Sequence, residues 1–320
     1  MPDIVMHHFF GKSVLDQLPD TCKEKITNIE LFDFATLGPD IFFFLDFFIS
    51  KKGRKNYQFG LKMHEEKTQY FLKKMVELSK QYPDLFSYLA GFITHYYLDS
   101  IAHPFILYHT GEYQKSDYTT HIYRGLHNRL EKGMDIYVIE NHYDAKPYRF
   151  SISKEILKLK KIPKILQTPV DALFFEVYQM KNAYQKLNRA IRHERFFYRL
   201  TFDPYGWKNR LFSWLDKKEN EIDWKVLSYH NKRIEGLDYF NFRKAYWTHP
   251  IAGERLSNKS YWELFDDAIL QASKTIEQFE KAIFDQEDLD FETLIPNISY
   301  RTGLDCANKE IVQNVKNIFS

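Results

Sequence analysis

The sequence has few of the features that mark secreted, membrane-spanning or disulfide-bonded proteins. Only two of its 320 residues are cysteines, Cys22 and Cys306, and they match neither a zinc-binding cysteine pattern nor a disulfide framework. The first ten residues lack the basic stretch, apolar stretch and cleavage site of a secretory signal. The apolar run at residues 41–49 is too short to span a bilayer and contains Asp46. We therefore expect a cytoplasmic protein without a transmembrane segment.

An excess of charge of one sign is also missing. Lys and Arg number 45 and Asp and Glu number 43, which gives a net charge of +2. This balance disfavours nucleic acid as a substrate, because nucleic-acid sites usually carry a basic stripe. Two local basic runs, at residues 51–55 and 158–164, are more typical of a solvated surface than of a site for phosphate or an anionic membrane.

Period-two strand patterns, internal repeats and flexible linkers are absent, whereas apolar residues recur at helical spacing. The sequence therefore predicts an all-α fold and a single domain over residues 1–320. In it, residues 1–145 would form a first helical part and residues 146–320 a helical, loop-rich remainder. The expected helices cover residues 12–18, 40–49, 64–79, 85–104, 118–140, 169–199 and 261–284, and Pro104 is expected to end the fourth.

Residues that bind metals occur at four-residue intervals in two of these helices. His95, Asp99 and His103 share one helix face, because a step of four residues turns a helix by only about 40°. His127 and Glu131 repeat this spacing in the next helix. Burying imidazoles and a carboxylate in so apolar a setting costs several kcal/mol unless each has a partner. Imidazole nitrogen and carboxylate oxygen are ligands that zinc accepts, so the two helices predict a metal site and make residues 1–145 the metal-binding helices.

Three further segments of the N-terminal half fit that prediction. His7 and His8 precede the expected first helix, Asp40 begins a very apolar helix, and His64 begins the helix after it. Asp40 and His64 also have ordinary explanations, as an acid that complements a helix dipole and as a surface histidine. Two other histidines are not expected to be ligands: His109 belongs to a loop, and His121 lies on the substrate side or has no role.

The order of these residues resembles the zinc-dependent phospholipase C family, and most closely its intracellular branch. The resemblance covers about residues 1–140, and residues 247–268 resemble a stretch near the C-terminus of that branch. It is carried by the motifs His7, Gly38-Pro39-Asp40, His64, His95-x3-Asp99, His103-Pro104 and His127-x3-Glu131.

The resemblance implies that the chain binds two or three Zn²⁺ ions. The first ion would have Asp40, His64, His95 and Asp99 as ligands, the second His103, His127 and Glu131, and the third His7, with Asp99 bridging. His7 is preferred to His8 because the intracellular branch reads His-x2-Phe-Gly, and His8 stays an alternative. In secreted members an N-terminal Trp also binds the third zinc, whereas this chain starts with Met1-Pro2-Asp3. Those members also place five residues between the aspartate and the next histidine, where this chain has three.

The activity that the resemblance implies is hydrolysis of a phosphodiester, with a phospholipid or another phosphoester as substrate and Asp40 as the general base. Aromatic loops after residue 200 would supply an apolar approach surface for lipid, or they would belong to the core. Two alternatives stay open: a single-strand nuclease-like phosphodiesterase on the same fold, and a non-catalytic helical module that binds metal. Three protein ligands at the second site favour an open, catalytic zinc.

Two other classes of metal protein are excluded by missing motifs. No histidine is followed by Asp, as His-Asp phosphohydrolases require, and the Glu-x2-His motif of ferritin-like di-iron proteins is absent.

Overall fold

Helices form nearly all of the regular structure, which confirms the all-α prediction. The computed structural model describes residues 4–47, 50–216, 224–230 and 236–319. The α-helices are α1 (Ile4–Gln17), α2 (Asp20–Lys25), α3 (Ile29–Ala35), α4 (Ile41–Phe44), α5 (Lys51–Glu65), α6 (Thr68–Gln81), α7 (Phe86–Thr110), α8 (Leu126–His142), α9 (Ile152–Glu155), α10 (Gln167–Tyr178), α11 (Ala183–Thr201), α12 (Trp207–Leu215), α13 (Tyr261–Glu280) and α14 (Phe291–Leu294). The 3₁₀-helices are η1 (Gly38–Asp40), η2 (Pro83–Leu85), η3 (Tyr118–Tyr123), η4 (Pro147–Arg149), η5 (Lys164–Leu166) and η6 (Trp224–Leu227), and η7 (Lys281–Asp285) is a π-helical turn.

Strand structure among the described residues is confined to one short ladder and one isolated bridge. Strands β1 (Trp247–Thr248) and β2 (Leu256–Ser257) run antiparallel, with Trp247 opposite Ser257 and Thr248 opposite Leu256. No helix in the described part of the chain is long and apolar enough to cross a membrane.

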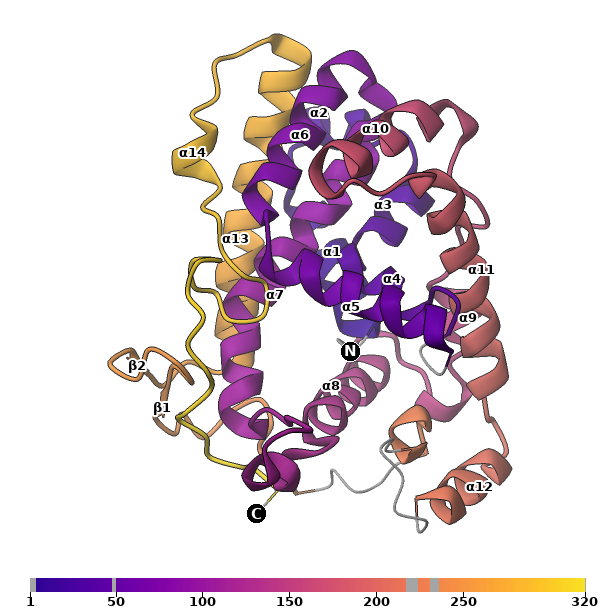
Figure 1. Cartoon of the computed structure of the whole chain (residues 1–320), viewed down its shortest axis with the longest axis vertical. Helices are drawn as coiled ribbons and strands as arrows, with labels where there is room; N and C mark the ends of the chain where they lie inside the picture. The colour runs from indigo at the N-terminus through magenta and orange to yellow at the C-terminus, as the bar shows by residue number, and fades with distance from the viewer. Residues whose placement is uncertain (1–3, 48–49, 217–223, 231–235, 320) are drawn as a thin grey trace.

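Helix α7 runs through the middle of the molecule and organises the fold (Figure 1). It packs against α1, α3, α6, α8 and α13, and every residue from Phe86 to Ser100 is buried. A helix surrounded in this way must be apolar on all sides, which explains why its few polar side chains stand out in the sequence. The buried apolar side chains around it form one connected core.

The prediction that Pro104 ends this helix is wrong, because α7 continues to Thr110. A proline inside a helix leaves the carbonyl four residues earlier without its usual partner, and here that carbonyl belongs to Ser100. Gly303 lies directly against it: a Cβ at Gly303, where φ is +64°, would be 2.3 Å from the Ser100 oxygen. Residues 295–306, which we call the C-terminal segment, therefore pack onto α7 at its proline.

The first helix begins earlier than the sequence predicts, and the third begins later. Helix α1 starts at Ile4, so His7 and His8 lie within it and not before it. His64 lies in the last turn of α5 and not at the head of the following helix. The chain breaks after it because Lys67 adopts a left-handed conformation with φ of 59°, and α6 begins only at Thr68.

Left-handed residues also divide other expected helices. The run predicted as one helix over residues 40–49 forms only η1 and α4, which ends before Asp46 and Phe47, whose φ angles are 61° and 52°. Residues 48 and 49 lie outside the described residues. Gly125 separates η3 from α8, and Gln179 and Asn182 lie between α10 and α11, all with positive φ.

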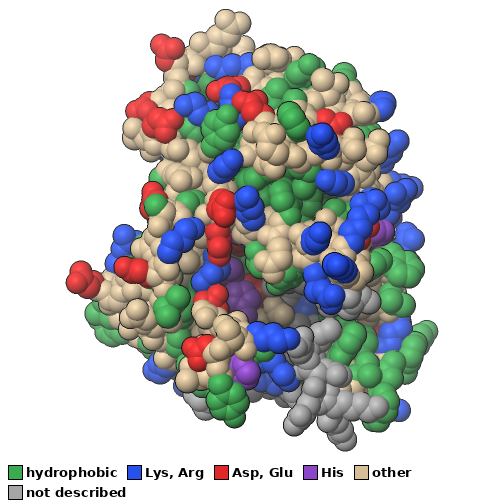
Figure 2. All heavy atoms as spheres, in the orientation of Figure 1, with side chains coloured by type: hydrophobic (Ala, Val, Ile, Leu, Met, Phe, Trp, Pro, Cys, Tyr) green, Lys and Arg blue, Asp and Glu red, His purple; other side chains and the backbone are tan. Residues whose placement is uncertain are grey.

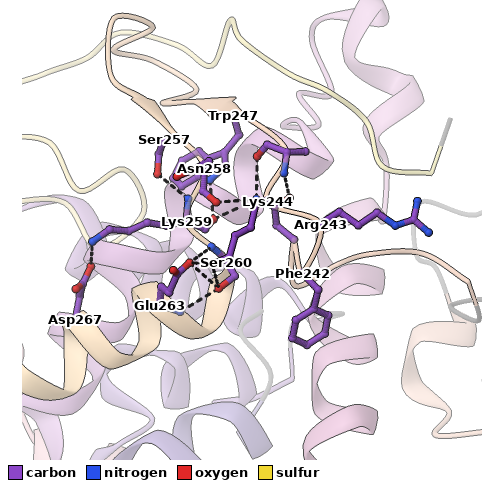
Figure 3. Close-up of polar contacts among 12 residues, drawn as sticks. Phe242, Arg243, Lys244, Trp247, Ser257, Asn258, Lys259, Ser260, Glu263 and Asp267 are labelled. Carbon is purple, nitrogen blue, oxygen red and sulfur yellow. Dashed lines mark hydrogen bonds and ion pairs between the residues drawn. The ribbon is translucent and has the colours of Figure 1, made fainter.

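Helix α13, which packs along α7 and α1, starts at a well-defined cap (Figure 3). The Ser260 hydroxyl accepts a hydrogen bond from the Glu263 N–H at 3.3 Å, and the Glu263 carboxylate accepts one from the Ser260 N–H at 2.7 Å. Lys244 pairs with Glu263, and Lys259 pairs with Asp267 one turn later. This reciprocal cap fixes the point at which the chain enters α13 after the β1–β2 ladder.

Candidate metal centre

Five ligand-type side chains from four parts of the chain meet beside α7, and we call them the inner group. No member has more than 6% of its surface exposed. Within the sets His7–His95–Asp99 and Asp40–His64–His95, the ligand atoms all lie within 4.8 Å of one another. The members are His7 of α1, Asp40 of η1, His64 of α5, and His95 and Asp99 of α7.

Asp99 contacts three histidines of the inner group. Its Oδ1 lies 3.2 Å from Nε2 of His7, and its Oδ2 lies 3.2 Å from Nε2 of His95 and 3.8 Å from Nε2 of His64. Asp40 Oδ1 lies 3.1 Å from the same nitrogen of His64. Despite these short distances, Asp99 Oδ2, Asp40 Oδ1 and His95 Nε2 make no hydrogen bond with the described residues. Buried polar atoms that converge without pairing are suited to coordinating a shared cation.

Backbone carbonyls hold the opposite edges of two of these rings. His64 Nδ1 lies 2.8 Å from the Gly60 carbonyl oxygen, and His95 Nδ1 lies 3.3 Å from that of Thr36. A carbonyl only accepts, so Nδ1 carries the proton in both rings and Nε2 is left to bind a metal. Gly38 makes the approach of His95 possible, because a Cβ at this position would lie 2.4 Å from the His95 ring.

The electrostatics of the inner group favour positive charge beside its carboxylates. Burial raises the pKa of Asp99, but His95 and His7 lower it by more, so it lies well below its usual value. Burial lowers the pKa of His7 and of His64, yet Asp99 and Asp40 respectively raise both above the usual value. For His95 burial dominates and its pKa is lowered. The inner group therefore stabilises the ionised form of Asp99 next to positive charge.

His103, His127 and Glu131 form a second set, which we call the outer group, with ligand atoms within 4.8 Å of one another. The Nε2 atoms of the two histidines are 3.1 Å apart, and they lie 3.7 and 3.0 Å from Glu131 Oε1. Burial raises the pKa of Glu131, but His127 and His103 lower it to below its usual value. With 24% of the His127 side chain and 12% of the His103 side chain exposed, this group lies nearer to solvent than the inner group.

One cavity reaches both groups. It is lined by His7 and Asp99 of the inner group and by His103 and Glu131 of the outer group. Apolar side chains complete its wall: Met6, Leu98, Ala102, Ile106, Met134 and Tyr261. A molecule in this space would contact both sets of ligand-type side chains.

The remaining histidines of the N-terminal half lie elsewhere. His8 is hydrogen-bonded to the Tyr143 hydroxyl through Nδ1 at 2.7 Å, and its Nε2 lies 3.7 Å from Asp33, outside both groups. His121 is exposed in η3. The expectation that His109 lies in a loop is wrong, because it is buried in the last turn of α7. Both cysteines are free and buried.

Comparison with known proteins identifies the family. A sequence model of the zinc-dependent phospholipase C family matches residues 6–190. The chain belongs to the zinc-dependent phospholipase C family. No curated protein and no solved structure matches it. The matched region contains all eight side chains of the inner and outer groups, and membership of the zinc-dependent phospholipase C family indicates a zinc-dependent, phospholipase C-like activity.

Residues outside the matched region also contact the inner group. The N–H of Tyr300 donates to the His64 carbonyl at 2.9 Å, and its buried ring lies edge-on to His64 and His95, with centroid distances of 5.8 and 5.6 Å. Next to it, the Arg301 guanidinium donates to Glu65 and Glu112, both at 2.9 Å. Sequence reasoning missed these residues because no local pattern marks a contact between segments so far apart in the chain.

Proposed function

We propose that this protein hydrolyses phosphodiesters with two or three zinc ions held by the inner and outer groups. The observation that carries the proposal is the convergence of buried carboxylate oxygens and imidazole nitrogens that lack hydrogen bonds in the inner group. Protonated histidines alone would leave this arrangement poorly satisfied, whereas cations at the shared positions would satisfy every member.

The proposal takes its ligand sets from the family resemblance, and the short distances within the inner and outer groups support it. Asp40, His64, His95 and Asp99 would hold one ion, and His7 with Asp99 a further one, since the two oxygens of Asp99 face different histidines. The three members of the outer group would hold another. Their greater exposure leaves room for a ligand that the protein does not supply, which is the property of a catalytic zinc.

When bound, zinc ions lower the pKa of water and neutralise the charge on phosphate oxygens. The protein's own contribution is to place an acceptor for the proton of the attacking water. Asp40 has this role in the proposal, because its Oδ1 lies at the inner group and has no hydrogen-bond donor of its own among the described residues. The phosphoester would enter the cavity that reaches both groups, and its apolar wall suits an acyl or glycerol portion better than a free phosphate.

The test is a substrate panel with the zinc-loaded protein. Bis-p-nitrophenyl phosphate comes first, followed by short-chain phosphatidylcholine and a single-stranded oligonucleotide, which separates the lipase-like from the nuclease-like activity. Replacement of Asp40 with Asn is expected to reduce turnover by ~10²–10⁴ while the zinc content stays within one ion of the wild type. Asp203→Asn is the matched control, because Asp203 is also buried but lies outside both groups. Full turnover in Asp40→Asn would show that the proton acceptor is another group.

A further inference from the structure

The outward surface of α11 and α12 carries apolar and basic side chains together. On α12, Trp207, Leu211 and Trp214 recur at spacings of four and three residues, so they share one helix face, and they are 57%, 44% and 52% exposed. On α11, Phe196 and Leu200 share a face in the same way and are 55% and 58% exposed. Apolar stripes at this spacing normally face a core, whereas these face outward.

Basic side chains lie on the same faces. Arg192 and Arg199 flank Phe196 at spacings of four and three on α11, and Arg210 lies between Trp207 and Trp214 on α12. These three arginines are exposed, and none has a carboxylate partner among the described residues. We call the apolar and basic side chains together the α11–α12 face: Arg192, Phe196, Arg199, Leu200, Trp207, Arg210, Leu211 and Trp214. Figure 2 shows hydrophobic side chains at the surface at the lower right, where Figure 1 places α12, with Lys and Arg side chains above them.

The local charge balance differs from that of the whole chain. Residues 181–216 contain eight Lys and Arg but three Asp and Glu, and two of these acids, Glu194 and Asp203, are buried. The whole chain is nearly neutral, so this stretch carries an excess of positive charge that the rest of the chain balances. A surface of one sign attracts an extended surface of the opposite sign.

We infer that the α11–α12 face binds the surface of an anionic lipid bilayer. Trp and Phe side chains enter the boundary between headgroups and acyl chains, and arginines beside them contact anionic headgroups. A second copy of the chain is a poorer occupant, because a symmetric dimer through this face would bring arginines against arginines. The inference concerns binding alone and does not depend on the proposed hydrolysis.

The experiment is co-sedimentation of the full chain with vesicles of phosphatidylcholine alone and of phosphatidylcholine mixed with phosphatidylglycerol. The protein is expected to sediment with the mixed vesicles, to bind the neutral ones weakly, and to bind less as salt is raised. Arg199→Gln/Arg210→Gln should reduce partitioning onto the mixed vesicles roughly 25-fold, which corresponds to about 1 kcal/mol for each arginine. Trp207→Ser/Leu211→Ser should reduce it roughly tenfold or more on both kinds of vesicle.

Two matched controls change exposed residues away from this face. Lys80→Gln/Lys274→Gln removes the same charge, and Leu270→Ser/Ile311→Ser removes exposed apolar surface, so both should bind as the wild type does. Turnover of a soluble phosphodiester, where it is present, should be equal in all four variants. Trp207→Phe, a conservative change, should reduce quenching of the protein's fluorescence by brominated lipid, which keeps the test valid if a serine variant misfolds.

Three outcomes would overturn the inference. In the first, the wild type does not sediment with the mixed vesicles. In the second, the variants of the α11–α12 face bind as well as their controls. In the third, light scattering would show a dimer that Trp207→Ser/Leu211→Ser dissociates, which would make the face an interface between copies.

Discussion

Removing metal from the protein should lower its melting temperature by an amount that reports the number of ions bound. Zinc stabilises only the folded chain, because the inner and outer groups are assembled from segments far apart in sequence. At a free zinc concentration of about 1,000 times the dissociation constant, each ion adds about 4 kcal/mol to the free energy of unfolding. For 320 residues the unfolding entropy is roughly 0.7 kcal/mol/K, so each ion raises the melting temperature by about 6 °C.

Differential scanning calorimetry before and after chelation measures this shift, and elemental analysis of the same samples counts the ions. Two ions should give a difference of about 12 °C. In Asp99→Asn, which keeps the size of the side chain but removes the charge shared by three histidines, we expect the loss of at least one ion and its share of the shift. Asp203→Asn is the control, because Asp203 is 5% exposed and Asp99 is 4% exposed, so both variants remove a buried carboxylate.

The reasoning would be refuted by a metal-free protein that melts at the same temperature with and without zinc. It would also be refuted if Asp99→Asn kept the full metal content, since convergence on Asp99 would then have no bearing on binding. A similar loss of metal in Asp203→Asn would instead point to general destabilisation.

Two further predictions concern the C-terminal segment and the end of α7. Gly303→Ala should lower the free energy of unfolding by more than the ~1–2 kcal/mol that a left-handed alanine costs, and should weaken zinc binding, because the new Cβ would meet the carbonyl of Ser100, the residue after Asp99 of the inner group. The control is Gly236→Ala, where φ is also positive but no atom lies within 4 Å. Equal losses of stability in urea titrations of the two variants would contradict the prediction. Burial, with Lys316 nearby, lowers the pKa of His109 to about 4. Between pH 6.5 and pH 4 the unfolded chain therefore binds a proton at His109 that the folded chain does not, so the folded state loses stability as pH falls. This group should cost the wild type about 2 kcal/mol between pH 8 and pH 5, and urea titrations of His109→Phe should lack that part of the pH dependence; an unchanged pH dependence would contradict the assignment.

The parts of the candidate site that the sequence predicts are those in which one helix sets the spacing. His95 and Asp99 lie one turn apart on α7, as do His127 and Glu131 on α8, and in each pair an Nε2 faces a carboxylate oxygen at 3.2 and 3.0 Å. A four-residue step fixes such a pair whatever the rest of the fold does. The all-α class is predictable for the same reason, since helical periodicity is a local property.

Helix boundaries were less predictable because single residues decide them. Lys67 and Gln179 adopt left-handed conformations that break helices, although neither side-chain type favours that conformation as glycine does. Pro104, by contrast, should end a helix and does not. In all three cases tertiary packing overrides the local preference, and a local pattern does not record that packing.

The inner group also depends on residues that carry no metal-binding signal at all. His64 lies at the end of a helix, where its ring is held by the Gly60 carbonyl and its backbone by the N–H of Tyr300. Arg301 then ties Glu65, the residue after His64, to Glu112, which follows the end of α7. The helices that supply His64 and Asp99 are thus joined by a segment more than 100 residues beyond the matched family region. Even where a four-residue step sets the spacing of two ligand-type side chains, the geometry of the whole group can depend on a distant segment, because the carbonyls and rings that orient each side chain need only be close in space.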